Sequence, residues 1–410
     1  MIGTAALDPL FLGDASGWDI FWVMVIKVGV AFAALMVSVM LMIWWERKFI
    51  SDLQNRIGPN RAGPFGLLQT LADGIKLFFK EDLIPDQSDR FVFKLAPFLS
   101  LVPAFLVFAV VPVAGDFSAD GDGTVTWFGN ETFVQLADPH MGILFVLAMS
   151  SIAVYGIMLA GWSSGSKYPL LGSVRASAQM VSYEAALGLA LVAVLLKTGT
   201  LSTHEIALTQ ADSIRDWGLI TTAFVPFIIF FIASTAELNR PPFDLVEAEQ
   251  EIVGGFHTEY SSIRFALFFL AEFMNVITMS AVMITLFFGG PAGPWYPGFI
   301  PAALMGFIWF FIKLVIFVSV FILLRGTLPR LRYDQLMDLG WKFLIPLSLG
   351  WVMTLALVDV FGERGQDGFG WRLALFGIAF AAMAMFGALL MKAVRNGAEH
   401  REREGEEVYG

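Results

Sequence analysis

The chain has 410 residues, of which 57% are hydrophobic and 15% carry a charge, and it includes 40 phenylalanines and 12 tryptophans. Soluble domains average about 25% charged residues, so this composition predicts an all-α polytopic membrane protein rather than a soluble one. The net charge of −10 argues against nucleic-acid binding, which requires a basic surface.

Cysteine is absent, which excludes iron–sulfur clusters, thiolate zinc sites and redox thiols held by this chain. Only four histidines occur, and all fall in predicted loops, at segment edges or in the tail: His140, His204, His257 and His400. No pair of them is placed to hold a haem inside a bilayer, and we expect no metal site. Any electron that the protein handles must therefore stay on a bound small molecule or on a partner's cofactor.

A membrane-spanning helix needs roughly 20 mostly apolar residues. The first seventeen residues contain no lysine or arginine, so we expect no cleavable signal and a first segment that stays in the mature chain. The fourth of the apolar segments is short and polar at its start. In chain order the segments are residues 18–45, 92–114, 141–162, 180–196, 219–235, 265–288, 301–324, 341–360 and 371–393.

The distribution of cations predicts the orientation of these segments. The loop after the first segment is rich in lysine and arginine, whereas residues 115–140 contain none. Because cytoplasmic loops carry the excess of cations, the loops after segments one, three, five and seven should face the cytoplasm, with the N-terminus in the periplasm. Nine segments would place residues 392–410, a tail of mixed charge that we expect to be solvated, in the cytoplasm.

The first basic loop contains two predicted features. Gly-Pro pairs at residues 58–59 and 63–64 indicate a non-helical turn flanked by arginines. Residues 67–80 then form an amphipathic pattern that is too short to span, which predicts a helix on the membrane surface. The cations of this loop set topology, but Arg47, Arg56 and Arg61 are also candidates for the mouth of a cavity that takes the headgroup of an amphipathic ligand.

The loop after the fifth segment concentrates acidic charge in an otherwise apolar part of the chain. Six acids lie between residues 237 and 259 against a single cation, Arg240: Glu237, Asp244, Glu247, Glu249, Glu251 and Glu259. Pro241-Pro242 ends the preceding helix, and Asp244 is a candidate N-cap for a new one in which Glu247 and Glu251 share a face. Crowded carboxylates raise each other's proton affinity, so this loop indicates proton handling or quinone chemistry.

Several of the ionisable residues that fall inside the apolar segments are candidates for a function. Glu184 lies in the fourth segment, Glu272 in the sixth and Lys313 in the middle of the seventh. Because a charge facing lipid is costly, we expect these side chains to face other helices or water. Pairing of Glu272 with Lys313 is one option, and a purely structural ion pair is an alternative to a functional role.

Several motifs resemble those of the quinone-site membrane subunit family of complex I, the proton-pumping NADH–quinone oxidoreductase. The resemblance runs from about residue 44 to residue 346. It rests on Glu46-Arg47-Lys48, Asn55-Arg56-Ile57-Gly58-Pro59-Asn60-Arg61, Ala72-Asp73-Gly74-Ile75-Lys76, Gly161-Trp162-Ser163-Ser164, Glu237-Leu238-Asn239-Arg240-Pro241-Pro242-Phe243-Asp244, His257-Thr258-Glu259-Tyr260-Ser261 and Leu328-Pro329-Arg330-Leu331-Arg332-Tyr333-Asp334-Gln335-Leu336.

The resemblance implies a membrane subunit without a redox centre that forms the membrane side of a ubiquinone chamber in a bacterial inner membrane. FMN and iron–sulfur clusters would lie on partner subunits of the peripheral arm, and other membrane-arm subunits would pack beside this chain. The chamber and the peripheral-arm contact would map to Glu46, Arg47, Arg56, Asp73, Lys76, Phe243 and Asp244. The family's acidic passage, which couples quinone reduction to proton translocation, would map to Glu184, Glu237, Glu247, Glu249, Glu251 and Glu272.

The chain departs from the family in two places. Val246 stands where relatives commonly have proline, and the ninth segment exceeds the family's usual eight, so we expect a core of residues 1–360 and an added span with a charged tail at 361–410. Three alternatives stay open: the equivalent subunit of a membrane-bound hydrogenase, a secondary ion transporter that uses Lys313 and Glu272, and a passive anchor for the peripheral arm.

Overall fold

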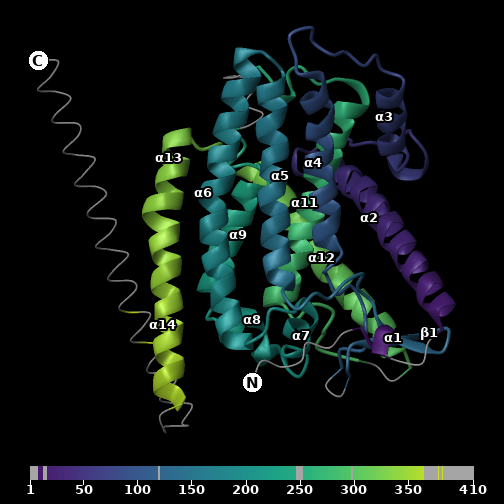
Figure 1. The fold of residues 1–410 in the computed structure, drawn as a ribbon, viewed down its shortest axis with the longest axis vertical. Coiled ribbons are helices and arrows are strands. Elements are labelled where there is room, and N and C mark those ends of the chain that lie inside the picture. Colours follow the sequence, from purple (N-terminus) through teal and green to yellow (C-terminus); the bar gives the residue numbers. More distant parts are fainter. Residues whose placement is uncertain are drawn as a thin grey trace, which may run out of the picture.

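The computed structural model describes residues 8–12, 16–118, 121–245, 253–296 and 299–363, together with Gly377 and Ala381. These residues form a helical bundle with one short β-hairpin at one end (Figure 1). Seven described helices are long and apolar enough to cross a membrane, which confirms the predicted all-α polytopic class. They are Gly17–Leu53 (α2), Arg90–Phe108 (α4), Gly142–Ser163 (α5), Lys167–Thr198 (α6), Ser262–Phe287 (α11), Ala302–Thr327 (α12) and Tyr333–Val360, which contains α13 and most of α14.

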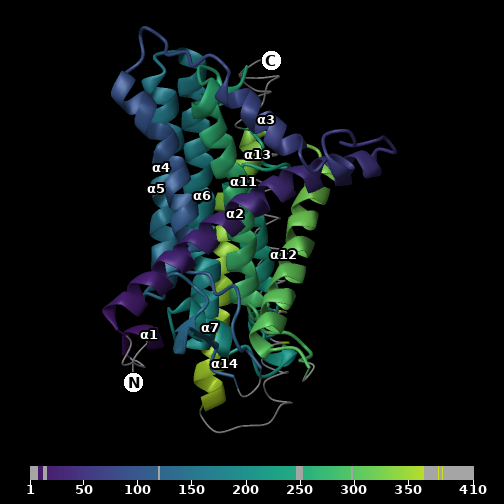
Figure 2. The ribbon, with the colours of Figure 1, turned by 90° about the vertical axis from the view of Figure 1, so that its right-hand side faces the viewer.

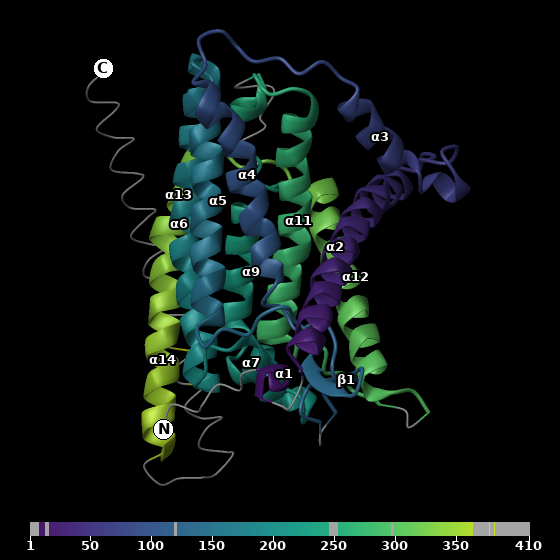
Figure 3. The same cartoon turned by 45° about the vertical axis from the view of Figure 1, so that its right-hand side comes forward.

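Helix α2 continues past the predicted segment and includes the charged residues that follow it. Ser16 caps its first turn by accepting a hydrogen bond from the backbone N–H of Asp19. Figure 3 shows α2 tilted against the nearly parallel helices α4, α5 and α6. A 3-10 turn over Pro64–Gly66 then leads into α3, Gln69–Phe78, which lies beside the second half of α2 (Figure 2). We call this side of the bundle the α3 end.

The apolar side chains of α3 are exposed in the isolated chain. Leu71, Ile75 and Phe78 are 47%, 51% and 69% exposed, and the hydroxyl of Thr70 donates to the carbonyl of Met40 on α2. A short helix held against a spanning helix, with an uncovered apolar face, is the geometry expected of a helix at the membrane surface.

Helices α4, α5 and α6 pack through small residues. A Cβ added at Gly156 on α5 would lie 2.2 Å from the hydroxyl of Ser100 on α4, and one at Gly161 would lie 2.2 Å from the hydroxyl of Ser173 on α6. Such residues let helix backbones approach closely in a membrane. Helix α6 begins well before the predicted fourth segment because its polar first half is buried against protein, as Gln179, which is fully buried, illustrates.

The opposite side of the bundle, the hairpin end, is closed by short elements. Helix α1 (Pro9–Leu12) contacts β2 (Asn130–Phe133), which pairs antiparallel with β1 (Thr124–Trp127). The buried ammonium of Lys27 donates to Asp8 at 2.8 Å and to Thr132 at 2.5 Å, which ties α2 to both elements. The other short elements here are α7 (Thr203–Leu208), a 3-10 turn (Ile214–Asp216) and α8 (Gly218–Thr221).

The helix is interrupted within the predicted fifth segment. Helix α8 ends at Thr221 and α9 runs over Val225–Glu237, because Ala223 and Phe224 have positive φ angles of 57° and 65°. The freed carbonyl of Thr222 accepts a hydrogen bond of 3.0 Å from the indole of Trp351. A buried donor thereby satisfies a backbone group that the break leaves without its helical partner.

Helix α11 lies inside the bundle, and α12 follows it to the α3 end, where α13 (Tyr333–Asp338) continues through a π-helical turn (Leu339–Leu344) into α14 (Ile345–Glu363). The predicted ninth segment, residues 371–393, lies outside the described residues except for Gly377 and Ala381.

Lys313 and Glu272 do not form the ion pair that their positions inside the apolar segments made possible. The ammonium of Lys313 donates to three backbone carbonyls in the turn after α11, those of Phe288, Gly290 and Ala292, at 2.5, 2.9 and 2.5 Å. Glu272 lies in the other half of α11, and at 1.5 Å per residue the two sites are about 24 Å apart along that helix. Glu272 instead faces Arg240, at 3.3 Å.

The loop after α9 is fixed from two directions. The amide nitrogen of Gln179 on α6 donates to the carbonyls of Ala236 and Phe243 at 2.8 and 2.9 Å. From the linker after α12, the backbone N–H of Leu331 donates to the carbonyl of Pro242 at 3.0 Å. The described part of this loop, which includes a cis peptide between Pro241 and Pro242, is therefore held rigidly against α6 and the linker.

The second part of the loop, from residue 253, holds α4 and the segment that precedes it. A 3-10 turn (Gly255–His257) leads to Tyr260, whose ring stacks on Phe93 at 4.1 Å and whose hydroxyl donates to the carbonyl of the same residue. Burial raises the pKa of Tyr260 to about 12, so this phenol remains a neutral donor. The hydroxyl of Ser262 donates to the carbonyl of Lys80 at 2.8 Å.

Candidate functional site

A cavity of about 510 Å³ opens at the α3 end between α2, α11 and α12, and we call it the outer cavity. Its wall combines cationic and apolar side chains, which suits a ligand with a polar head and an apolar body. The lining residues are Ile43, Glu46, Arg47, Ile50, Arg56, Ile57, Gly58, Pro59, Phe269, Phe273 and Arg325.

The structure brings three of the predicted chamber residues, Glu46, Arg47 and Arg56, to this cavity. Arg47 also pairs with Asp73 on α3 at 2.6 Å, and Asp73 accepts a second hydrogen bond from Gln69 at 3.2 Å. This pair connects the cavity wall to the surface helix. Both side chains are about 40% exposed, so the pair contributes orientation more than stability.

Four alternating charges lead from the outer cavity into the bundle. Arg325 pairs with Glu46, Glu46 pairs with Arg240 at 3.1 Å, and Arg240 faces Glu272 at 3.3 Å. Arg240 is 1% exposed, and its guanidinium also lies over the ring of Phe273 at 4.7 Å. We call these four residues the charge chain.

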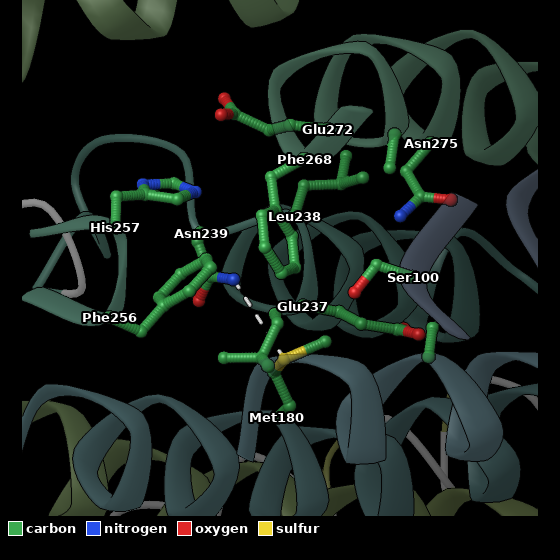
Figure 4. A pocket seen from close by; sticks show the side chains of 13 residues that line it. Ser100, Met180, Glu237, Leu238, Asn239, Phe256, His257, Phe268, Glu272 and Asn275 are labelled. Atoms are coloured by element: carbon green, nitrogen blue, oxygen red, sulfur yellow. Dashed lines mark hydrogen bonds between the residues drawn. The ribbon is translucent and has the colours of Figure 1, made fainter. Parts of the chain in front are cut away.

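A second, smaller cavity lies at the inner end of the charge chain, and we call it the acid pocket. Its volume of about 50 Å³ is enough for a few water molecules. Glu272 and His257 lie on one side of it, and the carboxylate of Glu237 points toward Ser100 and Asn275 on the other (Figure 4). Its floor is apolar, and Met180 accepts a hydrogen bond of 3.8 Å from Asn239.

Glu237 also lines a third cavity of about 20 Å³ between α4, α5 and α11, which we call the inner cavity. Among the described residues, Oε2 of Glu237 is buried with no hydrogen-bond partner, and the hydroxyl of Ser150 on the cavity wall is close by. The next serine, Ser151, donates to Glu184 on α6. Glu184 and Glu237 are near enough to interact electrostatically.

The remaining predicted residues have other environments. Phe243 is buried in the bundle, with its ring 5.5 Å from that of Tyr183, and Asp244 pairs with Arg330 at 2.9 Å. Lys76 is exposed on α3, and Arg61 is exposed in the loop before it. Three of the predicted acids lie outside the described residues, as does the helix that Asp244 would cap: Glu247, Glu249 and Glu251.

Several residues of the site were not predicted. Arg325 ends a long apolar helix, where an arginine ordinarily marks a membrane boundary, and its partner Glu46 is 279 positions away in the sequence. Ser150 and Ser151 belong to a helix whose other residues are mostly apolar. Serine hydroxyls in such a helix usually donate a hydrogen bond to a carbonyl of the preceding turn. Ser150 and Ser151 differ from other helical serines only in lying beside the carboxylates of Glu237 and Glu184.

The arrangement places acids on both sides of water-sized cavities. Glu272, Glu237 and Glu184 follow one another from α11 through α9 to α6, with the acid pocket between the first two and the serine pair between the last two. Carboxyl groups so spaced can exchange protons through water and hydroxyl groups, and they can respond together to a charge at the outer cavity.

Comparison with known proteins gives consistent results. A family model described as NADH dehydrogenase matches residues 26–356. Proteins named as the H subunit of NADH-quinone oxidoreductase from Frankia casuarinae and Frankia alni are each 47% identical, and each alignment covers 100% of this chain and 87% of the relative. A protein of the same name from Streptomyces avermitilis is 48% identical over 86% of this chain and 76% of its own length.

Proposed function

The chain belongs to the family of H subunits of NADH-quinone oxidoreductase, as a membrane subunit of complex I, and from this premise we propose that its outer cavity forms the membrane side of a quinone chamber. We further propose that the carboxylates beyond the charge chain couple quinone reduction to proton translocation. The observation that carries this proposal is the unbroken sequence of contacts and cavities from Arg325 to Glu184.

In this proposal the chain binds and orients the quinone and holds protons, while electrons arrive from partner subunits. Arg47, Arg56 and Arg325 present positive charge to the carbonyl oxygens of the quinone head, and Phe269 and Phe273 contact its apolar part. Negative charge that develops on the head during reduction is stabilised by these cations. The quinone and the partner's cofactors perform the electron chemistry.

Binding at the outer cavity is tested with Arg47→Ala in membranes that contain the whole complex. Removing this cation should weaken inhibition by a quinone analogue about tenfold, the effect of one lost charged contact of about 1.4 kcal/mol. Arg264→Ala is the matched control, because Arg264 is also paired, with Asp82 at 3.0 Å, but lies outside the cavity lining. An unchanged inhibitor affinity in Arg47→Ala would remove Arg47 from the chamber.

Coupling is tested with Glu237→Gln, Glu184→Gln, Glu272→Gln and Glu249→Gln, the last to examine a predicted acid outside the described residues. Each should lower the number of protons pumped per quinone reduced, because the amide side chain of glutamine neither accepts nor releases a proton in this pH range. Glu205→Gln is the control, since Glu205 lies at the hairpin end and is bonded to Thr200. Normal quinone reduction and normal pumping in all four assembled variants would leave only a passive anchoring role.

We place the α3 end on the cytoplasmic side of a bacterial inner membrane, against peripheral-arm subunits, and the N-terminus in the periplasm. The basic first loop and the exposed face of α3 support this placement. Because the chain has no native cysteine, Lys80→Cys and Glu131→Cys can be labelled selectively from opposite sides. Labelling of both cysteines from the same side would contradict this orientation.

We retain the division into a core of residues 1–360 and an added span with its tail at 361–410.

A further inference from the structure

The charge chain connects two cavities that have no lining residue in common. Arg325 and Glu46 line the outer cavity, and Glu272 lines the acid pocket. Arg240 lines neither cavity, but its guanidinium reaches a carboxylate of each, Glu46 through Nη1 and Glu272 through Nε. The buried side chain of Arg240 lies in the protein between the two cavities and contacts one carboxylate at each of them.

Arg240 is held so that this double contact persists. Its backbone N–H donates to the carbonyl of Thr235 at 3.3 Å, and its carbonyl accepts from the N–H of Phe243 at 2.9 Å. The amide of Gln179 fixes the same turn from α6, and the face of the guanidinium lies on Phe273. A planar guanidinium with its face covered presents its N–H groups along fixed edges, unlike a flexible ammonium.

We propose that Arg240 is a positioning residue that transmits charge changes between the quinone chamber and the acid pocket, because it shares one guanidinium between Glu46 and Glu272. When Glu272 gains a proton, Arg240 binds Glu46 more strongly, and Glu46 holds Arg325 less. The charge of Arg325 then becomes more available to the outer cavity. This inference rests on the proposed function, and coupling of this kind is reciprocal between the two sites.

Among the described residues, two other ionisable groups line the acid pocket with Glu272. They are Glu237 on α9 and His257 in the loop after it. Neither lines the outer cavity, so neither supplies a direct route to the chamber. Within the part of the chain that the structure describes, Arg240 is the side chain that contacts a carboxylate at each cavity, so its substitution tests whether it carries the effect of a change at Glu272.

The test is a double-mutant cycle on the apparent KM for a short-chain quinone, measured in membranes with the intact complex. Glu272→Gln places a neutral group at the inner end, so KM should fall about fivefold, within the range of coupling between sites in proteins. In an Arg240→Gln background the same change should move KM by less than about twofold, whatever happens to kcat. If Arg240 has a purely structural role, Glu272→Gln should change KM by the same factor with and without Arg240.

Arg240→Gln leaves two buried carboxylates without their cation, so Arg240→Lys provides a variant that keeps the charge and the assembly. A single ammonium does not hold both carboxylates in the fixed geometry of a guanidinium, and the effect of Glu272→Gln on KM should again be lost. Arg264→Gln is the matched control, since Arg264 also has an ion pair and lies over a ring, that of Phe93. In that background the fivefold effect should remain.

Two outcomes would overturn the inference: an effect of Glu272→Gln on KM that is equal with and without Arg240, or no fall in KM in the parent background. Both leave the proposed function intact if the quinone-analogue sensitivity of Arg47→Ala and the pumping defect of Glu237→Gln are observed. Normal quinone reduction and normal pumping in all four glutamate variants would instead refute the proposed coupling itself.

Discussion

Replacing Lys313 with methionine tests whether a buried ammonium holds the turn that follows α11. Lys313 is 8% exposed, donates to three carbonyls and lies 4.7 Å from the ring of Trp217. Methionine keeps most of the volume and removes the donors. We expect a large loss of stability with little effect on the charge chain at the other end of α11.

The magnitude follows from the contacts. Three hydrogen bonds to a charged donor contribute about 1.5–3 kcal/mol each, or roughly 4.5–9 kcal/mol together. Removing the charge recovers the cost of about 2.5–3.5 kcal/mol for placing it in the membrane. The net destabilisation should therefore be about 1–6.5 kcal/mol.

The assay is reversible unfolding of the reconstituted protein in mixed micelles, with Lys197→Met as the matched control. Lys197 loses a single partner, Asp359, and its side chain is 19% exposed while that of Asp359 is 37% exposed. Such a pair should contribute at most about 1 kcal/mol. A Lys313→Met protein within about 0.5 kcal/mol of the parent, the range of an ordinary surface substitution, would refute the argument.

Three further predictions concern buried contacts elsewhere in the bundle. Burial lowers the pKa of His204 to about 4 from its ordinary 6.5, so the folded state favours the neutral ring. The stability that this contributes is complete above pH 6.5 and is lost as the pH falls toward 4, by about 3 kcal/mol. In His204→Phe, unfolding measured across that range should show a shallower pH dependence, and an identical slope would contradict the assignment. Gly156→Val should separate α4 from α5, because a Cβ there lies 2.7 Å from the backbone nitrogen of Ser100; the expected result is loss of assembled complex on native gels, with Gly188→Val, where a Cβ meets nothing within 4 Å, as the control. Gln179→Leu leaves the carbonyls of Ala236 and Phe243 without their donor and should cost about 1–3 kcal/mol. Faster proteolysis in the loop after α9 would support this prediction, and unchanged protection would count against it.

The sequence was most informative where hydropathy and periodicity agree. The amphipathic pattern of residues 67–80 predicts a surface helix, and the structure has α3 at Gln69–Phe78. It was less informative where polar residues are buried by protein. The first half of α6, which includes Ser173 and Gln179, has the composition of a loop, but both side chains are fully buried in the bundle. Hydropathy measures preference for lipid and does not detect this environment.

Two local features had signals that hydropathy does not detect. In the hairpin between β1 and β2, Phe128 and Gly129 have positive φ angles of 51° and 85°, a turn that glycine favours. The break at Ala223 and Phe224 precedes Pro226, which prefers the first turn of a helix. Both signals are short and lie beside long apolar segments, where helix is the stronger expectation.

Within the candidate site, the acids were predictable as residues but not as partners. Pairing of Glu272 with Lys313 was plausible from their positions in the apolar segments, but the helices pack with the two sites about 24 Å apart along α11. Arg240 was the one cation among six acids, and the sequence does not reveal that its carboxylates come from α2 and α11. Contacts between residues far apart in the chain depend on helix packing, which composition does not determine.

The order of charges in the charge chain gives it a direction. It begins with a cation, Arg325, whose side chain is 40% exposed toward the outer cavity, and it ends with an anion, Glu272, whose side chain is 25% exposed toward the acid pocket. The four residues together are neutral but form a dipole across the protein that separates the two cavities. A negative charge entering the outer cavity and a positive charge entering the acid pocket each meet the end of opposite sign, so the resting protein favours their simultaneous arrival.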